Sequence, residues 1–438
     1  GPVFLSLSLI GEPFPFSFPC TSLAARPSEG VNVSLLSISP PSPDQLMSAP
    51  LPATFVPGFH DEAEVRKMVF REMPHYGLVS IISFGASGLG GMFTAGKGSG
   101  LTDAAAEGNF GDPAVWFAEE AVEDIERARE IVHSCLKRGV NMIDSSHWYG
   151  QGRSERLLGH ALADVPRAAY FINTKIGRYE KATLGMFDFS FDKTYQAALD
   201  SLKRLKLDCV DSMQVHDPEF APSVDVILEE TLPALKKLKE EGKIRLIGMT
   251  GYPLALQQEI IVKSGVGIDT SLSYCHYSLN DTTLESSGFV DFCKSRGIAL
   301  INASPISMGL LMDRDPPDWH PANSETKALC KKAVAYCKEA GVDISKLALH
   351  FTLRNERIAT TLISSTSVMR MGANLDAVNE VLSQAEEDAL TLLREKLFIP
   401  AGTQSWEGVE LAAYWQTVGK ALILERLYRK SNKKQKTG

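Results

Sequence analysis

Short apolar runs alternate with longer amphipathic stretches along most of this 438-residue chain. The apolar runs carry few charges, which is typical of parallel strands that are covered on both faces. They predict strands at Ile81–Phe84, Val140–Ile143, Tyr170–Thr174, Cys209–Val215, Ile244–Met249, Ile268–Ser273, Ile298–Ala303 and Thr360–Ile363. The stretches between them have the helical period and predict helices at Glu120–Lys137, Ser154–Ala163, Asp192–Leu205, Val226–Glu240, Leu254–Val262, Leu284–Ser295, Glu325–Glu339 and Ser345–Arg354.

This regular alternation predicts an α/β protein, a (β/α)8 TIM barrel. Two apolar segments near its start, Lys67–Phe70 and Leu78–Phe84, predict short strands and an N-terminal hairpin. A doubly wound open sheet is the structural alternative, and it usually has a phosphate-binding loop after its first strand. The glycine-rich segment 85–91 follows the first predicted barrel strand, but it lacks GxGxxG spacing and no helix begins directly after it. The barrel is therefore the favoured prediction.

The chain divides into three parts by composition. Residues 1–46 are rich in Pro, Ser, Phe and Leu and are interpreted as a disordered or spurious leader, while 47–382 form the predicted barrel. Residues 383–438 are predicted to be a C-terminal helical extension with an amphipathic stretch, Val409–Tyr428, and a basic tail. A Gly-, Ala- and Asp-rich stretch at 97–118 is interpreted as a loop insertion.

The extension begins with a recognisable helix start. Ser383 and Glu386 have the spacing of a capping box ahead of a predicted helix at Ala385–Lys396.

Composition limits the possible partners and compartment. A formal charge of −8 and a pI near 5.7 argue against a nucleic-acid-binding surface. No run reaches the ~18–20 apolar residues of a membrane helix. Seven cysteines without a CxxC pair fit reduced thiols and a cytoplasmic protein. The apolar run Phe4–Ile10 lacks the basic flank of a signal peptide. We predict no metal site, and a monomer or weak homodimer.

Four polar residues lie at or just after the ends of three successive predicted strands. Asp144 ends the second strand, Tyr149 follows in the next loop, Lys175 ends the third and His216 ends the fourth. Each alone has an ordinary structural explanation, as a cap, a packed ring, a solvated cation or a turn residue. In a (β/α)8 barrel, however, side chains at the carboxyl ends of strands meet at one rim, so we expect these four to form one site.

The chemistry of these four residue types points to proton transfer. A tyrosine hydroxyl has a reference pKa of ~10, which is high for a base near neutrality. An adjacent ammonium favours the phenolate, so Lys175 is expected to lower the pKa of Tyr149 while Asp144 keeps Lys175 charged. His216 would orient a substrate oxygen. Such a device suits carbonyl–alcohol redox chemistry, which requires a nicotinamide cofactor, NAD or NADP, because no side chain supplies hydride.

The segment 139–162, GVNMIDSSHWYGQGRSERLLGHAL, resembles the signature of the aldo-keto reductases, which are (β/α)8 oxidoreductases that use NAD(P). The resemblance implies catalytic roles for Asp144, Tyr149, Lys175 and His216.

The same resemblance implies cofactor contacts elsewhere on the rim. Thr250 matches a residue at the nicotinamide carboxamide, although Gly251 stands where the family usually has an Asn partner. Ser304 matches a serine at the pyrophosphate. The adenosine end is implied at the loop residues Ser365, Thr366 and Ser367 and at Arg370 and Asn374 of the helix that follows. Ser364 replaces a Lys often found there, so NAD is slightly favoured over NADP.

Several segments are similar to a narrower group of sugar dehydrogenases, acting on L-galactose, D-arabinose and D-threo-aldoses, that oxidise the anomeric carbon to a lactone. The segments are DSMQVHDPEF, LSYCHYSLND, INASPISMGLL and PPDWHPA. Trp148 and Trp319 are the candidate walls of a sugar pocket. Two alternatives stay open, an NADPH-dependent carbonyl reductase and a nucleotide-binding regulatory subunit of a potassium channel.

Overall fold

The computed structural model describes residues 48–91 and 119–420. These residues all lie within one compact unit that covers residues 39–438. The predicted leader 1–46 and the predicted insertion 97–118 both lie outside the described residues.

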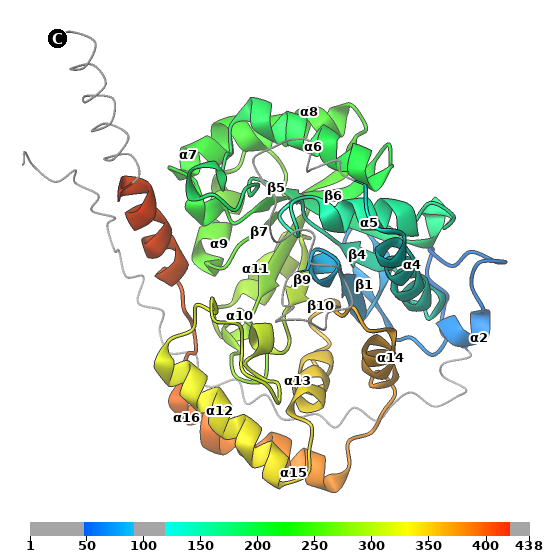
Figure 1. Ribbon diagram of the computed structural model, residues 1–438, viewed down its shortest axis with the longest axis vertical. Helices are drawn as coiled ribbons and strands as arrows, with labels where there is room; N and C mark the ends of the chain where they lie inside the picture. Colours follow the sequence, from blue (N-terminus) through cyan, green and yellow to red (C-terminus); the bar gives the residue numbers. More distant parts are fainter. Residues whose placement is uncertain (1–47, 92–118, 421–438) are drawn as a thin grey trace, which may run out of the picture. The chain divides into compact units, whose positions relative to one another are not determined.

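Eight parallel strands form a closed barrel, which confirms the predicted (β/α)8 fold (Figure 1). Their order around the barrel is β10-β3-β4-β5-β6-β7-β8-β9. The strands are β3 (Ile82–Gly85), β4 (Met142–Asp144), β5 (Phe171–Ile176), β6 (Val210–His216), β7 (Ile244–Thr250), β8 (Thr270–Tyr274), β9 (Ala299–Ala303) and β10 (Thr360–Ile363). Almost every strand residue is buried, as the apolar sequence of the strands requires.

The strand register places functional positions side by side at the carboxyl ends. Lys175 of β5 pairs with Gln214 of β6, and His216 of β6 pairs with Thr250 of β7. Asp144 of β4 pairs with Asn173 of β5. The predicted residues therefore come from neighbouring strands at similar heights.

Helices cover the outside of the barrel and extend beyond it (Figure 1). The longer ones are α4 (Val122–Lys137), α5 (Arg153–Ala161), α6 (Phe191–Leu205), α8 (Leu232–Glu240), α9 (Leu254–Lys263), α11 (Phe289–Ser295), α12 (Ser324–Glu339), α13 (Ile344–Leu353), α14 (Val368–Asp376) and α15 (Gln384–Leu392). The shorter ones are α2 (Glu62–Val65), α7 (Val224–Val226), α10 (Thr283–Ser286) and α16 (Ile399–Ala401). Residues 409–420 form a further helix.

An antiparallel hairpin precedes the barrel, as predicted, but its boundaries differ from those expected. β1 (Phe70–Met73) pairs with β2 (Gly77–Ser80), and a break at Ile81 separates β2 from β3. Tyr76 at the turn is buried and packs edge-on against Phe171, the first residue of β5, with ring centroids 5.0 Å apart, and its hydroxyl donates to Asn173 Oδ1 at 3.0 Å. The hairpin therefore closes the amino end of the barrel.

Two predicted helices are interrupted. The helix expected at Leu284–Ser295 consists of α10 and α11, because Gly288 adopts a left-handed conformation with φ 76° and breaks the helix. Within the helix predicted at Val226–Glu240, residues Ile227–Thr231 form a π-helical turn, η6, just before Pro233. Proline lacks the N–H of a regular helix, so a wider turn accommodates it.

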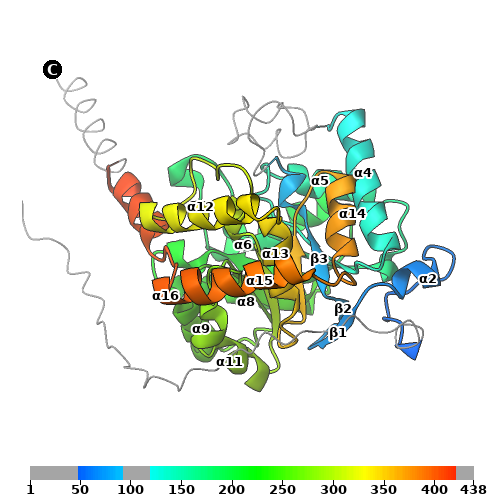
Figure 2. The same ribbon diagram turned by 90° about the horizontal axis from the view of Figure 1, so that it is seen from below.

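The C-terminal region packs on the barrel. The predicted capping box is present, since Ser383 and Glu386 each bond the other's backbone at the start of α15. This helix continues as a π-helix, η8 (Leu393–Phe398), which contacts α12 (Figure 2). Trp406 then stacks on Tyr252, with ring centroids 4.9 Å apart, and attaches the segment after α16 to the loop after β7.

Candidate active site

The four predicted proton-transfer residues lie together at the carboxyl ends of β4, β5 and β6. The Lys175 ammonium bonds Asp144 Oδ1, donates to the Ser145 carbonyl at 2.7 Å and lies 3.3 Å from the Tyr149 hydroxyl. Gln214 Nε2 donates to the second oxygen of Asp144 at 2.9 Å. Lys175 is therefore a fixed link between the carboxylate and the phenol.

The His216 ring completes the group. Its centroid is 6.2 Å from that of Tyr149, in an edge-to-face arrangement. Ser146 Oγ is 3.2 Å from His216 Nδ1, and Asp217 Oδ2 is 3.6 Å from His216 Nε2. Burial lowers the pKa of His216 to about 3, despite the opposing charge of Asp217. The imidazole is therefore neutral at physiological pH.

Electrostatics only partly match the sequence expectation. Burial lowers the pKa of Lys175, but Asp144 and Tyr149 raise it by more, so the amine remains an ammonium. Burial raises the pKa of Tyr149, and the Lys175 ammonium lowers it without cancelling the effect of burial. The expected net acidification of the phenol is therefore wrong for the protein alone, because the loss of water outweighs one nearby cation.

A close approach of two glycine-containing loops positions Tyr149. A Cβ atom added to Gly90 would lie 2.3 Å from the Tyr149 carbonyl carbon, and one added to Gly150 would lie 2.4 Å from the Gly90 oxygen. Gly150 also has φ +68°, which favours glycine. On the other side of the same segment, the Gly88 N–H donates to Ser364 Oγ at 2.9 Å. The segment 85–91 thus joins the Tyr149 loop to the loop after β10.

Three more polar residues adjoin the site and were missed in the sequence. Arg178 follows β5 and donates to Asp217 Oδ2 at 2.7 Å, and its guanidinium lies over the Trp148 ring, 4.1 Å from the centroid. Asp217 directly follows His216, the last residue of β6, and Glu219 lies two residues further on. Their position just past strand ends, the same signal that identified the four residues, could have found them.

The predicted cofactor residues lie on the same rim, after β7, β9 and β10. Ser367 caps α14 by accepting the Arg370 N–H at 3.3 Å, and Ser365 Oγ accepts the Ser367 N–H at 3.1 Å. The first N–H groups of a helix have no partners within it and favour an anion, so the start of α14 fits a phosphate-bearing group. Arg370 is exposed, and Asn374 is half-buried one turn further along the helix.

The remaining predicted cofactor residues lie among buried groups. Thr366 is half-buried in the loop that Gly88 approaches. Thr250 is buried, and its carbonyl accepts the Asp217 N–H at 2.8 Å. Ser304 has φ 61°, an uncommon value for serine. Thr250 ends β7, Ser304 directly follows β9, and the loop 364–367 joins β10 to α14, so these residues lie at the same end of the barrel.

Gly251 has a neighbour that explains its lack of a side chain. A Cβ atom added there would lie 2.7 Å from Glu219 Oε2. The Glu219 carboxyl therefore occupies the space where a side chain at position 251 would begin.

The two predicted pocket walls differ in their surroundings. Trp148 is half-buried between Tyr149 and Arg178, next to the four residues. Trp319 is 53% exposed and stacks on His320, at a centroid distance of 6.5 Å. The geometry supports Trp148 as a wall more directly than Trp319.

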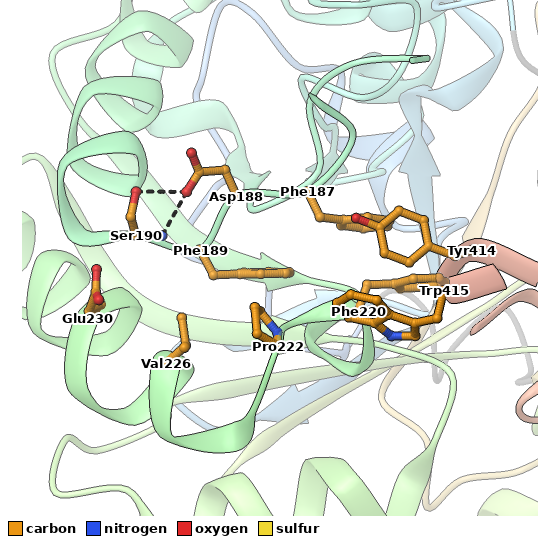
Figure 3. Close-up of a pocket in the computed structure, with 10 residues that line it drawn as sticks. All are labelled: Phe187, Asp188, Phe189, Ser190, Phe220, Pro222, Val226, Glu230, Tyr414 and Trp415. Carbon is orange, nitrogen blue, oxygen red and sulfur yellow. Dashed lines mark hydrogen bonds between the residues drawn. The ribbon is translucent and has the colours of Figure 1, made fainter. Parts of the chain in front are cut away.

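A hollow of about 250 Å³ is lined by residues other than the four proton-transfer residues (Figure 3). It is lined by Phe187, Asp188, Phe189, Ser190, Phe220, Pro222, Val226, Glu230, Tyr414 and Trp415. Tyr414 of the helix at 409–420 meets Phe187 and Phe220 edge-on, at 5.2 and 5.3 Å between centroids. The C-terminal helix is thereby attached to the loops after β5 and β6.

Within residues 48–91 and 119–420, no helix is both long and apolar enough to cross a membrane.

The barrel and its rim define an oxidoreductase, and comparison with known proteins identifies the family. The model of the Aldo/keto reductase family matches residues 116–395. The chain therefore belongs to the aldo-keto reductase family.

Named relatives include sugar dehydrogenases. L-galactose dehydrogenase of Arabidopsis thaliana is 38% identical over 344 residues, which cover 78% of this chain and 97% of that protein. D-arabinose 1-dehydrogenase of Saccharomyces cerevisiae is 30% identical over 236 residues, covering 51% of this chain and 68% of that protein. The predicted resemblance to this group is confirmed.

Solved structures share the fold. An aldo-keto reductase of Bacillus halodurans in its holo form has a TM-score of 0.55 and 23% identity, covering 75% of this chain and 97% of that chain. An aldo-keto reductase of Klebsiella pneumoniae in complex with NADPH has a TM-score of 0.51 and 17% identity, covering 75% of this chain and 95% of that chain.

Proposed function

We propose that this protein is an NAD(P)-dependent dehydrogenase that oxidises an aldose at C1 to the lactone, with Tyr149 as the general base. The observation that carries the proposal is the position of the Lys175 ammonium, bonded to Asp144 and 3.3 Å from the Tyr149 hydroxyl. An L-galactose-like sugar is the preferred substrate class, because the similarity to L-galactose dehydrogenase extends over 78% of the chain.

The chain's own residues would manage the proton. A bound nicotinamide dinucleotide supplies the hydride acceptor. The anomeric hydroxyl of the sugar lies between Tyr149 and His216, and Tyr149 takes its proton while Lys175 stabilises the negative charge that the phenol would carry. The neutral His216 donates a hydrogen bond to the reacting oxygen. Ser304, the loop 365–367 and Arg370 would bind the phosphates, and Thr250 would contact the nicotinamide end.

Carbonyl reduction is a second candidate function, and one observation favours it. The raised pKa of Tyr149 keeps the phenol protonated, which suits a proton donor to a carbonyl oxygen better than a base. The same residues can work in either direction. The direction thus depends on the substrate and on the dinucleotide that the protein binds.

A substrate panel separates the two functions. Purified protein is assayed with a set of aldoses plus NAD or NADP, and with simple aldehydes plus NADH or NADPH, by following the absorbance of the reduced nicotinamide. The proposal predicts the highest kcat/KM for an L-galactose-like sugar with NAD. Activity confined to aldehyde reduction with NADPH would replace it with the second candidate.

A further inference from the structure

Arg178, Asp217 and Glu219 form a polar group next to the four reactive residues, which we call the rim cluster. Arg178 follows β5, and the two acids follow β6. None of the three takes the proton in the proposed reaction. Their arrangement nevertheless leaves several hydrogen-bonding atoms buried and unused.

Arg178 is already occupied on most of its surface. Its Nη1 donates to Asp217 Oδ2 at 2.7 Å, and its guanidinium lies over the Trp148 ring at 4.1 Å and near the Phe187 ring at 5.3 Å. A guanidinium that is paired and packed in this way is poorly placed to bind an anionic substrate group. Its Nε is buried and has no hydrogen-bond partner within the described residues.

Asp217 is held in an unusual conformation with one oxygen unused. It is 2% exposed and has φ 52° and ψ 57°, in the left-handed region that few aspartates adopt. Its Oδ2 lies between Arg178 and His216, whereas Oδ1 is buried without a hydrogen-bond partner among the residues that the structure describes. Buried polar atoms are nearly always satisfied, and strained residues of this kind cluster at ligand sites.

The charge of Asp217 acts on groups from several elements around the rim. Its charge raises the pKa of Tyr149, which follows β4, and of Tyr274, at the end of β8. It also raises the pKa of Glu410 in the C-terminal helix. The loop after β4, the end of β8 and the C-terminal helix therefore each carry a group that this charge reaches.

Glu219 adds a group that can both donate and accept. Its Oε1 accepts the Tyr252 N–H at 3.0 Å, and Oε2 is buried with no hydrogen-bond partner in the described part of the chain. Burial and the charge of Asp217 raise the pKa of Glu219 to about 8. At neutral pH this carboxyl is mostly protonated, so Glu219 can donate to a ligand oxygen while Asp217 accepts.

We propose that Asp217 Oδ1, Glu219 Oε2 and Arg178 Nε bind hydroxyl groups of the sugar other than the reacting one, and that they select neutral polyhydroxylated substrates against sugar acids and sugar phosphates. Each sugar hydroxyl both donates and accepts, which matches this mixture of groups. The charge of Asp217 repels anions, and the two nearby cations, Arg178 and Lys175, are already paired with Asp217 and Asp144. This inference rests on the proposed function, whose aldose substrate it narrows.

The test compares Asp217→Asn with the wild-type protein and with Asp208→Asn, a change at an exposed aspartate. Asp217→Asn keeps an oxygen acceptor but removes its charge, and hydrogen bonds to charged groups are roughly twice as strong as neutral ones, so the variant should raise KM for the sugar by about tenfold. The ratio of kcat/KM for the sugar to that for an aldehyde without hydroxyl groups should fall by at least about tenfold. Asp208→Asn should match the wild type in both.

A second arm tests the selection against anions. The wild-type protein is assayed with the neutral sugar and with the same sugar carrying a carboxylate at C6. The wild-type kcat/KM should be about a hundredfold higher for the neutral sugar. In Asp217→Asn this ratio of kcat/KM values should be smaller by at least about tenfold. Thermal unfolding and dinucleotide binding check that Asp217→Asn folds. If it does not fold, the isosteric variant Glu219→Gln takes its place, and a smaller rise in KM for the sugar is expected.

The outcomes separate the two proposals. A wild-type KM in Asp217→Asn, or an equal loss for the sugar and the simple aldehyde, overturns the sugar subsite while leaving aldose oxidation intact. If the wild-type protein oxidises no aldose but reduces aldehydes, the proposed function itself fails, and the subsite with it.

Discussion

The hydroxyl of Ser146 lies 3.2 Å from His216 Nδ1, and the same oxygen accepts the Trp148 N–H at 3.1 Å. Because the Ser146 oxygen already accepts the Trp148 N–H, its own proton is available to Nδ1, and donation to Nδ1 goes with an imidazole proton on Nε2. The nearby Asp217 carboxylate, 3.6 Å from Nε2, favours the same tautomer. Ser146 is therefore a positioning residue for the hydrogen bond that His216 would donate.

We predict that Ser146→Ala lowers kcat by about tenfold to a hundredfold, because a misplaced proton weakens general acid–base catalysis. The His216 tautomer is followed by nitrogen NMR, and the Nε2–H form should lose its dominance in the variant. Ser146→Thr keeps the hydroxyl and should restore most of the activity. An unchanged tautomer in Ser146→Ala would show that the serine has only a packing role.

Tyr149→Phe should reduce turnover by about a hundredfold to ten-thousandfold, since it removes the proton-transfer group and retains the ring. Dinucleotide binding, measured by quenching of protein fluorescence, should stay close to the wild-type value. Turnover like that of the wild type would contradict the proposed mechanism.

The rate of sugar oxidation should rise with pH. Burial raises the pKa of Tyr149, so at neutral pH only a small fraction of the protein has the phenolate that acts as the base. Aldehyde reduction uses the protonated phenol and should stay flat over the same range. Because the pKa of His216 is about 3, its titration should cause no change in either rate between pH 6 and 8. A plateau of sugar oxidation below pH 7 would refute this assignment.

Gly90→Ala should displace the Tyr149 loop, because the new methyl group would lie 2.3 Å from the Tyr149 carbonyl carbon. We expect a fall in kcat of at least about tenfold, in line with the sensitivity of catalysis to small misplacements. Gly267→Ala is the matched control, since a Cβ atom there meets no heavy atom within 4 Å. Equal activities of the two variants would show that the loop tolerates the change.

Trp406→Ala should destabilise the protein by about 3–5 kcal/mol, the usual cost of truncating a buried aromatic side chain. Trp406 is 4% exposed and stacks on Tyr252, whereas Trp415 is 39% exposed. Trp415→Ala should therefore cost much less. Urea unfolding of both variants measures the difference. Similar stabilities would mean that the end of the chain contributes little to the barrel.

The barrel could be predicted because every strand is short, apolar and buried on both faces, so its pattern stands out between helices. Breaks inside elements were harder to see. Gly288 ends one helix and begins another because it has a positive φ, and a single glycine does not reveal that conformation in the sequence. The break at Ile81 was not predicted, because Ile81 lies within the largely apolar run that was interpreted as a single strand, Leu78–Phe84.

The reactive residues were predictable because Asp144, Lys175 and His216 lie at the ends of apolar strands and Tyr149 follows in the next loop. Arg178 and Glu219 also lie just past strand ends, so their place on the rim could have been predicted. Their contacts are made across loops, however, and spacing along the chain does not encode such contacts. The pKa of Tyr149 was predicted in the wrong direction for a similar reason. The sequence shows the lysine that lowers the pKa, but not the extent of burial that raises it.

Tyr76 and the hairpin of β1 and β2 close the amino end of the barrel. Substrate and product of a reaction beside Lys175 would therefore both pass through the rim at the opposite, carboxyl end of the barrel. Product must leave through this rim before the next substrate can bind, so product release can limit kcat even when proton transfer is fast.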